Sequence, residues 1–234
     1  MSSAAVTTIH RAVRFYEAPI GKKAVMALTG VILFGFVVVH MIDNLQIYSP
    51  DHDQINRLAA TLQAPAVAPL LWGLRLVLLS AVVLHIVAAV QLWSLNRAAR
   101  PSRYIKKDDV PTSYAARTMI WSGPIIAAFV IFHILHLTVG SVLPLQEFGP
   151  HMPNVRANVI LGFQNPAVAI FYIIAMLLLC THLYHGVWSM FQSVGVNHPR
   201  YTLWLKRFAA VSAFAIAIGN ISIPVAVLAG LLTY

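Results

Sequence analysis

Five long apolar stretches dominate the sequence and alternate with short polar connectors. The stretches cover residues 23–43, 69–95, 115–143, 163–193 and 204–232. A transmembrane helix needs about 20 predominantly apolar residues, so each stretch is long enough to cross a bilayer. The pattern predicts an all-α integral membrane protein, a bundle of five transmembrane helices that forms a single domain over residues 1–234.

The composition agrees with this prediction and limits the chemistry. Hydrophobic residues make up 59% of the 234 residues and charged residues only 10%, whereas a soluble domain is about 45–50% apolar. The longest connector has about twenty residues, which leaves no room for a soluble catalytic domain. The single cysteine, Cys180, excludes a disulfide framework and a cysteine-ligated iron-sulfur cluster.

The basic residues predict how the helices are oriented. Of the sixteen Lys and Arg residues, thirteen fall in the N-terminal segment or in the second and fourth connectors with their flanks, and only Arg57 and Arg156 fall on the opposite side. By the positive-inside rule, the N-terminus is cytoplasmic and Tyr234 is outside. The protein is therefore expected to be a multi-pass protein of the cytoplasmic (inner) membrane. Because the charge of +9 reflects topology, nucleic acid is not expected as a partner.

Six of the ten histidines lie inside predicted spans, which is unusual because ionisable groups in hydrocarbon are costly and commonly mark a functional site. A single histidine of this kind often only bonds to a neighbouring helix, but here four different spans carry one. These histidines are His40, His85, His133, His136, His182 and His185.

Counting residues from the cytoplasmic charges sorts these histidines into two layers. His40 is 17 residues beyond Lys23, and His133 is 16 beyond Arg117, so both are about 25 Å along their helices. His85 is 12 residues before Arg97, about 18 Å from the same side. In the fourth span, His182 and His185 are 15 and 12 residues before Asn197, which adds a second histidine-bearing helix to the inner layer.

Two imidazoles that face each other at one depth of a helical bundle suit a six-coordinate haem, whose iron takes one nitrogen on each face. Such ligation closes both axial positions and favours electron transfer. Four imidazoles in two separate layers do not converge tetrahedrally, so zinc fits less well. Arg75, about 15 Å outward of His85, is either a partner for haem propionates or an arginine that extends to the outer interface.

These residues also resemble a known family, the single-chain, five-span, di-haem cytochrome b membrane anchor of succinate:quinone oxidoreductases and fumarate reductases. The resemblance runs from about Lys22 to the last span. It rests on four motifs in order: "HMIDN" with His40, "LSAVVLHIVAAV" with His85, "FVIFHIL" with His133, and "FYIIAMLLLCTHLYHGVWS" with His182.

The resemblance implies that His40 and His133 bind an outer haem b and that His85 and His182 bind an inner one. It further implies a flavoprotein subunit that oxidises succinate to fumarate in the tricarboxylic acid cycle, and an iron-sulfur subunit that passes electrons through the haems to quinone. Menaquinone and ubiquinone both remain open as the quinone, as does a higher oligomer of the complex. The chain itself would not touch succinate.

Two further histidines, His136 and His185, are not ligands in the family motifs, and each lies three residues past a proposed ligand. Depth favours His133 over His136 in the third span. In the fourth span depth does not decide, although the 12-residue offset of His185 matches that of His85 slightly better, and the choice of His182 follows the motif. The extra histidines are candidates for contact with a propionate or, for His185, with quinone. Candidate quinone contacts lie in two clusters, and the sequence does not rank one above the other. The outer cluster consists of Asp43, Asn44, Gln46 and Glu147, and the inner cluster consists of Trp188, Ser189 and Gln192.

Two other functions compete with this interpretation. One is another di-haem membrane cytochrome b, such as a subunit of a quinol-oxidising complex or of a formate dehydrogenase. In the quinol-complex type, paired histidines on one helix are thirteen or fourteen residues apart, but here they are three apart. The other is a proton-coupled transporter with histidine relays, although the sequence lacks the internal repeat common in such folds.

Overall fold

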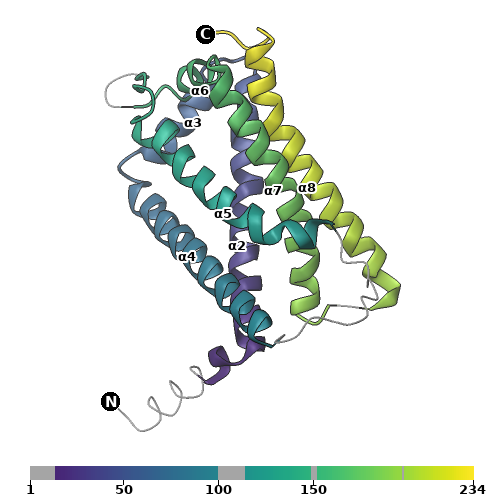
Figure 1. Ribbon diagram of the computed structural model, residues 1–234. Coiled ribbons are helices and arrows are strands. Elements are labelled where there is room, and N and C mark those ends of the chain that lie inside the picture. The colour runs from purple at the N-terminus through teal and green to yellow at the C-terminus, as the bar shows by residue number, and fades with distance from the viewer. Residues whose placement is uncertain (1–13, 100–113, 149–151, 197) are drawn as a thin grey trace, which may run out of the picture.

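The computed structural model describes residues 14–99, 114–148, 152–196 and 198–234, and in this part the chain is helical (Figure 1). Five of the described helices are long and apolar enough to cross a membrane, which confirms the predicted all-α membrane bundle. They are α2 (Pro19–Leu45), α4 (Ala68–Ala98), α5 (Tyr114–Ile134), α7 (Pro166–Ser193) and α8 (Pro199–Leu228).

The orientation in the membrane stays a prediction. The ends of the five helices alternate between the two ends of the bundle, so that α2 begins and α8 ends at opposite ends (Figure 1). Several of the basic residues that predict the cytoplasmic side lie outside the described residues, namely Arg11, Arg100, Arg103, Lys106 and Lys107.

Helix starts follow from local sequence. Proline stands in the first turn of α2, α4, α7 and α8, where a backbone N–H has no helical partner and the fixed φ suits the helix. Asn165 precedes Pro166 and caps α7, because its side-chain oxygen accepts a hydrogen bond from the Ala167 N–H at 3.0 Å. His198 caps α8 in the same way through the Arg200 N–H at 3.2 Å.

The spans differ in detail from the sequence prediction. The third span ends earlier than residue 143, because α5 continues only as a π-helical turn, η2 (Leu135–Val139), and Gly140 stops it with a φ of 76°. The fourth and fifth spans begin at Pro166 and Pro199 rather than at 163 and 204, and the fifth ends at Leu228 rather than at 232.

Two short helices lie in connectors that the sequence predicts only as polar. They are α3 (Gln54–Gln63) and α6 (Val155–Phe163), and they pack on each other at the end of the bundle where α8 ends (Figure 1). At ten and nine residues, both are too short to appear in a search for spans. They cover the bundle end through buried side chains such as Ile55 and Ile160.

Helices α2 and α7 form the centre of the bundle. They pack on each other and both pack on α8, whereas α4 packs along α2 and α5 packs along α7. In the described part of the chain α4 and α5 do not pack along one another, and Figure 1 draws them as separate flanking helices. Large apolar side chains such as Leu70, Trp72 and Leu79 are exposed on α4, as expected of a surface that faces lipid.

One stripe of α4 faces α2. Ala81, Ala88 and Leu92 are the buried residues of α4, and His85 lies on the same stripe because residues three or four apart share one side of a helix. The packing of α4 therefore turns His85 toward the bundle.

Candidate functional site: two histidine pairs between spanning helices

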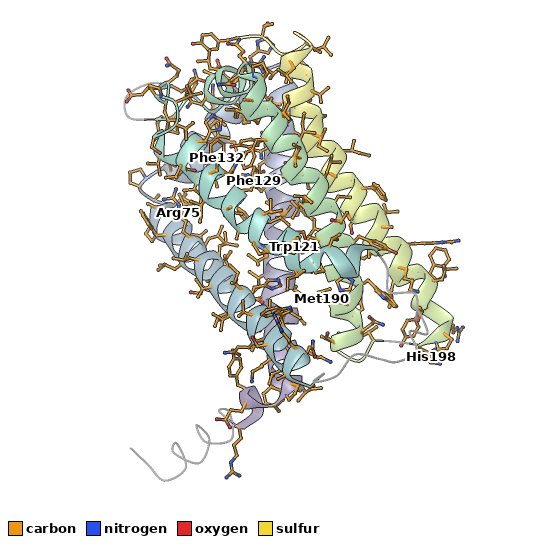
Figure 2. All side chains as sticks on the ribbon, in the orientation of Figure 1. Arg75, Trp121, Phe129, Phe132, Met190 and His198 are labelled. Atoms are coloured by element: carbon orange, nitrogen blue, oxygen red, sulfur yellow. The ribbon has the colours of Figure 1, made fainter. Side chains whose placement is uncertain are left out.

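The outer pair joins α2 and α5. The ring centres of His40 and His133 are 5.7 Å apart, and the ring planes are nearly perpendicular, at 87°. Phe36, one turn before His40, stacks on the His40 ring with centres 5.3 Å apart and planes 17° apart. On α5, Phe129 lies against His133, with ring centres 5.9 Å apart, and Figure 2 shows Phe129 on that helix. Aromatic side chains thus hold both rings of this pair.

The inner pair joins α4 and α7. The ring centres of His85 and His182 are 6.4 Å apart, with planes at 54°. Gly30 of α2 faces His85, because a Cβ added at Gly30 would lie 3.6 Å from the His85 Cε1 atom. The four histidines with motif matches therefore meet in two pairs, each between helices distant in sequence.

The spacing of both pairs suits two imidazoles on opposite sides of one metal ion. An imidazole nitrogen binds a metal at about 2.0–2.1 Å, so the two nitrogens are about 4 Å apart and the ring centres, each roughly 1 Å farther out, are about 6 Å apart. The observed distances of 5.7 and 6.4 Å bracket this value.

The described residues offer no group of three or more His, Cys, Asp or Glu side chains that could hold a metal ion. Two imidazoles on their own are too few for a free metal ion but enough for an iron whose other four ligands come from a macrocycle. Space is open on one side of α7, since a Cβ at Gly186 would have no neighbour within 4 Å, and Gly186 lies four residues after His182 and therefore on the same side of the helix. These features fit haem.

The two pairs lie about 15 Å apart along the bundle, and the residue spacings on three helices agree on this separation. On α2, Gly30 faces the inner pair and His40 belongs to the outer pair, ten residues away, which is about 15 Å at 1.5 Å per residue. On α7, His182 and Tyr172, which bonds to the outer pair, are also ten residues apart. On α5 the separation from Ser122 to His133 is eleven residues, about 16 Å.

Hydroxyl groups contact the Nδ1 atoms of three of the four histidines. Thr29 Oγ1 is 3.1 Å from His85 Nδ1, Ser122 Oγ is 3.3 Å from His182 Nδ1, and the Tyr172 hydroxyl is 3.3 Å from His133 Nδ1. A contact at Nδ1 leaves Nε2 as the nitrogen that is free for a metal.

His136 belongs to the outer layer but not to the pair. It is 1% exposed, and its Nδ1 is 2.9 Å from the Tyr172 hydroxyl, which it shares with His133. Its Nε2 is buried and has no hydrogen-bond partner among the described residues. A Cβ at Gly162 would lie 2.7 Å from that nitrogen, so the ring fills the space that a glycine of α6 leaves.

His185 is turned to its own helix. Its Nε2 is 3.1 Å from Ser189 Oγ, one turn later on α7. Trp188 faces α8, where the Lys206 ammonium lies 5.1 Å from the ring centre, and Gln192 is exposed. The three inner quinone candidates, Trp188, Ser189 and Gln192, therefore lie near the end of α7 beside α8. A cavity of about 500 Å³ nearby is lined by Pro199, Thr202, Leu203 and Lys206.

Arg75 is exposed and lies at the beginning of α4 (Figure 2). Its guanidinium carbon is 4.8 Å from the ring centre of Trp72 in the same helix. This stacking is what an arginine extending toward the membrane interface would show, and a propionate contact for Arg75 stays a prediction.

The outer quinone candidates are spread over several elements. Asp43 and Asn44 end α2, Gln46 begins the short 3₁₀ helix η1 (Gln46–Tyr48), and Glu147 pairs with Pro153 in an isolated β-bridge. A polar cavity of about 370 Å³ lies at this end of the bundle, but its lining contains none of these four. It is lined by His52, Asp53, Asn56, Asn154, Arg156, Thr233 and Tyr234.

Sequence reasoning missed the hydroxyl residues around the pairs. Tyr172 stands in the "FYI" part of a motif already noted. Thr29 and Ser122 are only six and five residues beyond Lys23 and Arg117, about 9 and 8 Å along their helices, so counting from the charges does not group them with His85. The chain was also compared with protein-family models, curated proteins and solved structures, and none of the three comparisons gives a match.

Proposed function

We propose that this chain is the membrane-anchoring, electron-transferring subunit of a succinate:quinone oxidoreductase and that it binds two haems b. His40 and His133 would ligate the outer haem, and His85 and His182 the inner one. Bound haem supplies a one-electron carrier, and bis-histidine ligation reserves it for electron transfer. Partner subunits, a flavoprotein and an iron-sulfur protein, would deliver the electrons, and quinone in the membrane would accept them.

The single observation that carries this proposal is the meeting of four histidines, from four spanning helices, in two pairs with ring centres 5.7 and 6.4 Å apart. Each histidine comes from a different helix, so the pairing is not a by-product of sequence neighbours. With a separation of about 15 Å along the bundle, two haems bound at these pairs would lie one above the other across the membrane.

The chain's own residues orient the ligands and exclude water. Phe36 and Phe129 cover the rings of the outer pair, and the apolar helices keep bulk water from both pairs. A low-dielectric surrounding of this kind is one of the factors that set the potential of a haem.

A proton relay is the rival that one observation favours, because His133, Tyr172 and His136 form a continuous chain of contacts. That chain ends at His136 Nε2, which is buried and has no hydrogen-bond partner in the described part of the chain. Haem is the preferred proposal because the four paired histidines meet across four helices, whereas a relay along this one chain of contacts would not require the pair of His85 and His182.

Optical spectroscopy tests the proposal directly. The purified chain, expressed with haem synthesis intact, should give a dithionite-reduced minus oxidised spectrum of the b type, and a pyridine haemochrome assay should give two haems per chain. An absence of b-type absorption would refute the cytochrome function, and one haem per chain would refute the two-layer arrangement.

Pull-down separates succinate:quinone oxidoreductase from other di-haem cytochromes. An affinity tag on this chain, solubilised in mild detergent from its own cells, should recover a subunit with covalently or tightly bound flavin and another with iron-sulfur clusters, together with succinate-dependent quinone reduction. Recovery with a formate-oxidising subunit instead would assign the chain to the alternative cytochrome.

A further inference from the structure

The two histidines of the inner pair are each contacted by a hydroxyl group from a helix other than their own. Thr29 of α2 contacts His85 of α4 at 3.1 Å, and Ser122 of α5 contacts His182 of α7 at 3.3 Å. Both hydroxyl residues are buried. Their contacts therefore form inside the bundle, where a hydrogen bond is stronger than in water.

Both hydroxyl groups also contact backbone carbonyl oxygens of their own helices. Thr29 Oγ1 donates toward the Val25 oxygen at 2.8 Å and lies 3.1 Å from the Met26 oxygen. Ser122 Oγ donates to the Met119 oxygen at 3.4 Å. A hydroxyl has one proton and two lone pairs, so while that proton is donated to the carbonyl, each oxygen can act toward the histidine only as an acceptor.

The histidine must then supply the proton. Nδ1 of His85 and Nδ1 of His182 each carry a hydrogen and donate to the hydroxyl oxygen, which leaves Nε2 of each neutral ring unprotonated. Nε2 with its lone pair is the form of imidazole that binds a metal, and a partner on the other nitrogen fixes both the tautomer and the ring orientation.

We propose that Thr29 and Ser122 are positioning residues for the inner haem: they hold His85 and His182 as Nδ1–H tautomers with Nε2 presented to the iron. This inference rests on the proposed haem function. Because each hydroxyl belongs to a neighbouring helix, the ring orientation depends on how α2 packs on α4 and on how α5 packs on α7.

The outer pair lacks this arrangement and therefore serves as an internal control. Tyr172 faces two imidazoles with one hydroxyl proton, so it accepts from one ring and donates to the other, and its position does not fix which. His40 has a stacked phenylalanine on its ring. Substitutions at Thr29 and Ser122 should leave the outer haem unchanged.

The test is potentiometric titration of both haems, with low-spin electron paramagnetic resonance spectra, in the intact complex. Thr29→Val keeps the shape and removes the acceptor; without it the His85 imidazole is less basic and stabilises the oxidised iron less. We expect a more positive midpoint potential for the inner haem, 10- to 100-fold weaker haem retention, and an unchanged outer haem. Ser122→Ala should act in the same direction, and Thr29→Ser should restore the wild-type values.

Ser212→Ala is the control, because within the described part of the chain Ser212 of α8 bonds only to carbonyl oxygens of its own helix. Unchanged inner potentials in Thr29→Val and Ser122→Ala, with both haems bound, would overturn the inference. So would a Thr29→Ser variant that behaves like Thr29→Val. A wild-type chain without haem would instead refute the proposed function, which the spectrum of the parent protein reveals before any variant is made.

Discussion

His182 and His185 lie one turn apart on α7, yet their side chains have different neighbours. His182 lies opposite His85 with ring centres 6.4 Å apart, whereas His185 bonds to Ser189 in its own helix at 3.1 Å. Side chains three residues apart point about 60° apart around a helix, and the packing of α7 decides which one reaches the partner. Geometry therefore separates two residues between which depth counting did not decide.

His182→Ala should therefore remove the inner haem, while His185→Ala should leave both haems bound. The measurement is the haem content per chain together with the reduced minus oxidised spectrum. His185→Ala is the matched control, since it deletes an imidazole from the same helix at nearly the same depth. Loss of haem from His185→Ala with full retention in His182→Ala would show that the ligand had been assigned to the wrong residue.

Gly162 on α6 is in close contact with His136. A Cβ at this position would lie 2.7 Å from the Cε1 and Nε2 atoms of the His136 ring, and that ring is fully enclosed. Gly162→Ala should force the ring away from Tyr172 and lower the free energy of unfolding by about 1–3 kcal/mol, as overpacking does.

Denaturant unfolding of the detergent-solubilised chain measures the effect of Gly162→Ala. Gly73→Ala on α4 is the control, because a Cβ there meets nothing within 4 Å. Alanine is the better helix former, so this control should be neutral or slightly stabilising. Equal free energies of unfolding for the two variants would show that the His136 ring can move aside without loss of stability.

Sequence reasoning reached the histidines but not their surroundings. The rise per residue of a helix is fixed, so counting from charged ends gives depth, and depth grouped His40 with His133 and placed His85 in the layer of His182 and His185. The rotation of each helix about its axis depends on packing with its neighbours. The roles of Thr29, Ser122 and Gly162 depend on that rotation and could not be read from one segment.

Among the elements, the short helices α3 and α6 organise the end of the bundle where α8 ends. Asn154 caps α6 by accepting from the Ala157 N–H at 3.0 Å, and it also accepts from the Asn56 amide of α3 at 3.1 Å. Neither helix has the length or apolar run that a hydropathy pattern detects. The sequence could predict the five spans because bilayer thickness sets their length, but no such constraint marks α3 and α6.

Arg156, at the start of α6, ties three parts of the chain together. It is 8% exposed, and its guanidinium donates to the Ile47 oxygen at 2.7 Å and to the Thr233 oxygen at 3.4 Å. Arg156→Ala should leave these carbonyl groups without their donor and cost about 1.5–3 kcal/mol of unfolding free energy. Thermal and denaturant unfolding in detergent measure this loss.

Arg57→Ala is the control for Arg156→Ala. Arg57 pairs with Asp51, and both side chains are more than half exposed. Its hydrogen bond lowers the pKa of the Asp51 carboxyl, so the pair persists at neutral pH and is lost as the pH falls through that lowered value. Because water screens an exposed pair, removing it should change stability little. A loss equal to that of Arg156→Ala would contradict the role given to burial.

For the whole molecule, the charges and the fold make one joint prediction. Lys22, Lys23 and Arg97 lie at the end of the bundle where α2 begins, and Arg57 and Arg156 lie at the other end. The positive-inside rule assigns the first of these ends to the cytoplasm. The fold shows that successive helix ends alternate between the two ends of the bundle, and the charge bias predicts which end is cytoplasmic.

Cysteine labelling tests this orientation in whole cells. In a Cys180→Ala background, Pro50→Cys should react with a membrane-impermeant maleimide, whereas Val196→Cys should react only after the cells are permeabilised. Both positions are exposed and lie between helices at opposite ends of the bundle. The reverse pattern would place the N-terminus outside.

The packing of α4 on α2 and of α5 on α7 has a consequence for how the protein matures. Helices α2 and α4 form one packed pair, and α5 and α7 form another. Each proposed haem would connect the two helix pairs, the outer haem from α2 to α5 and the inner haem from α4 to α7. Ligand insertion would then clamp the two helix pairs together and add its binding free energy to folding. In detergent extracts of cells starved of haem precursor, a protease should cut the chain faster within α4 and α5, and resupply of the precursor should restore resistance.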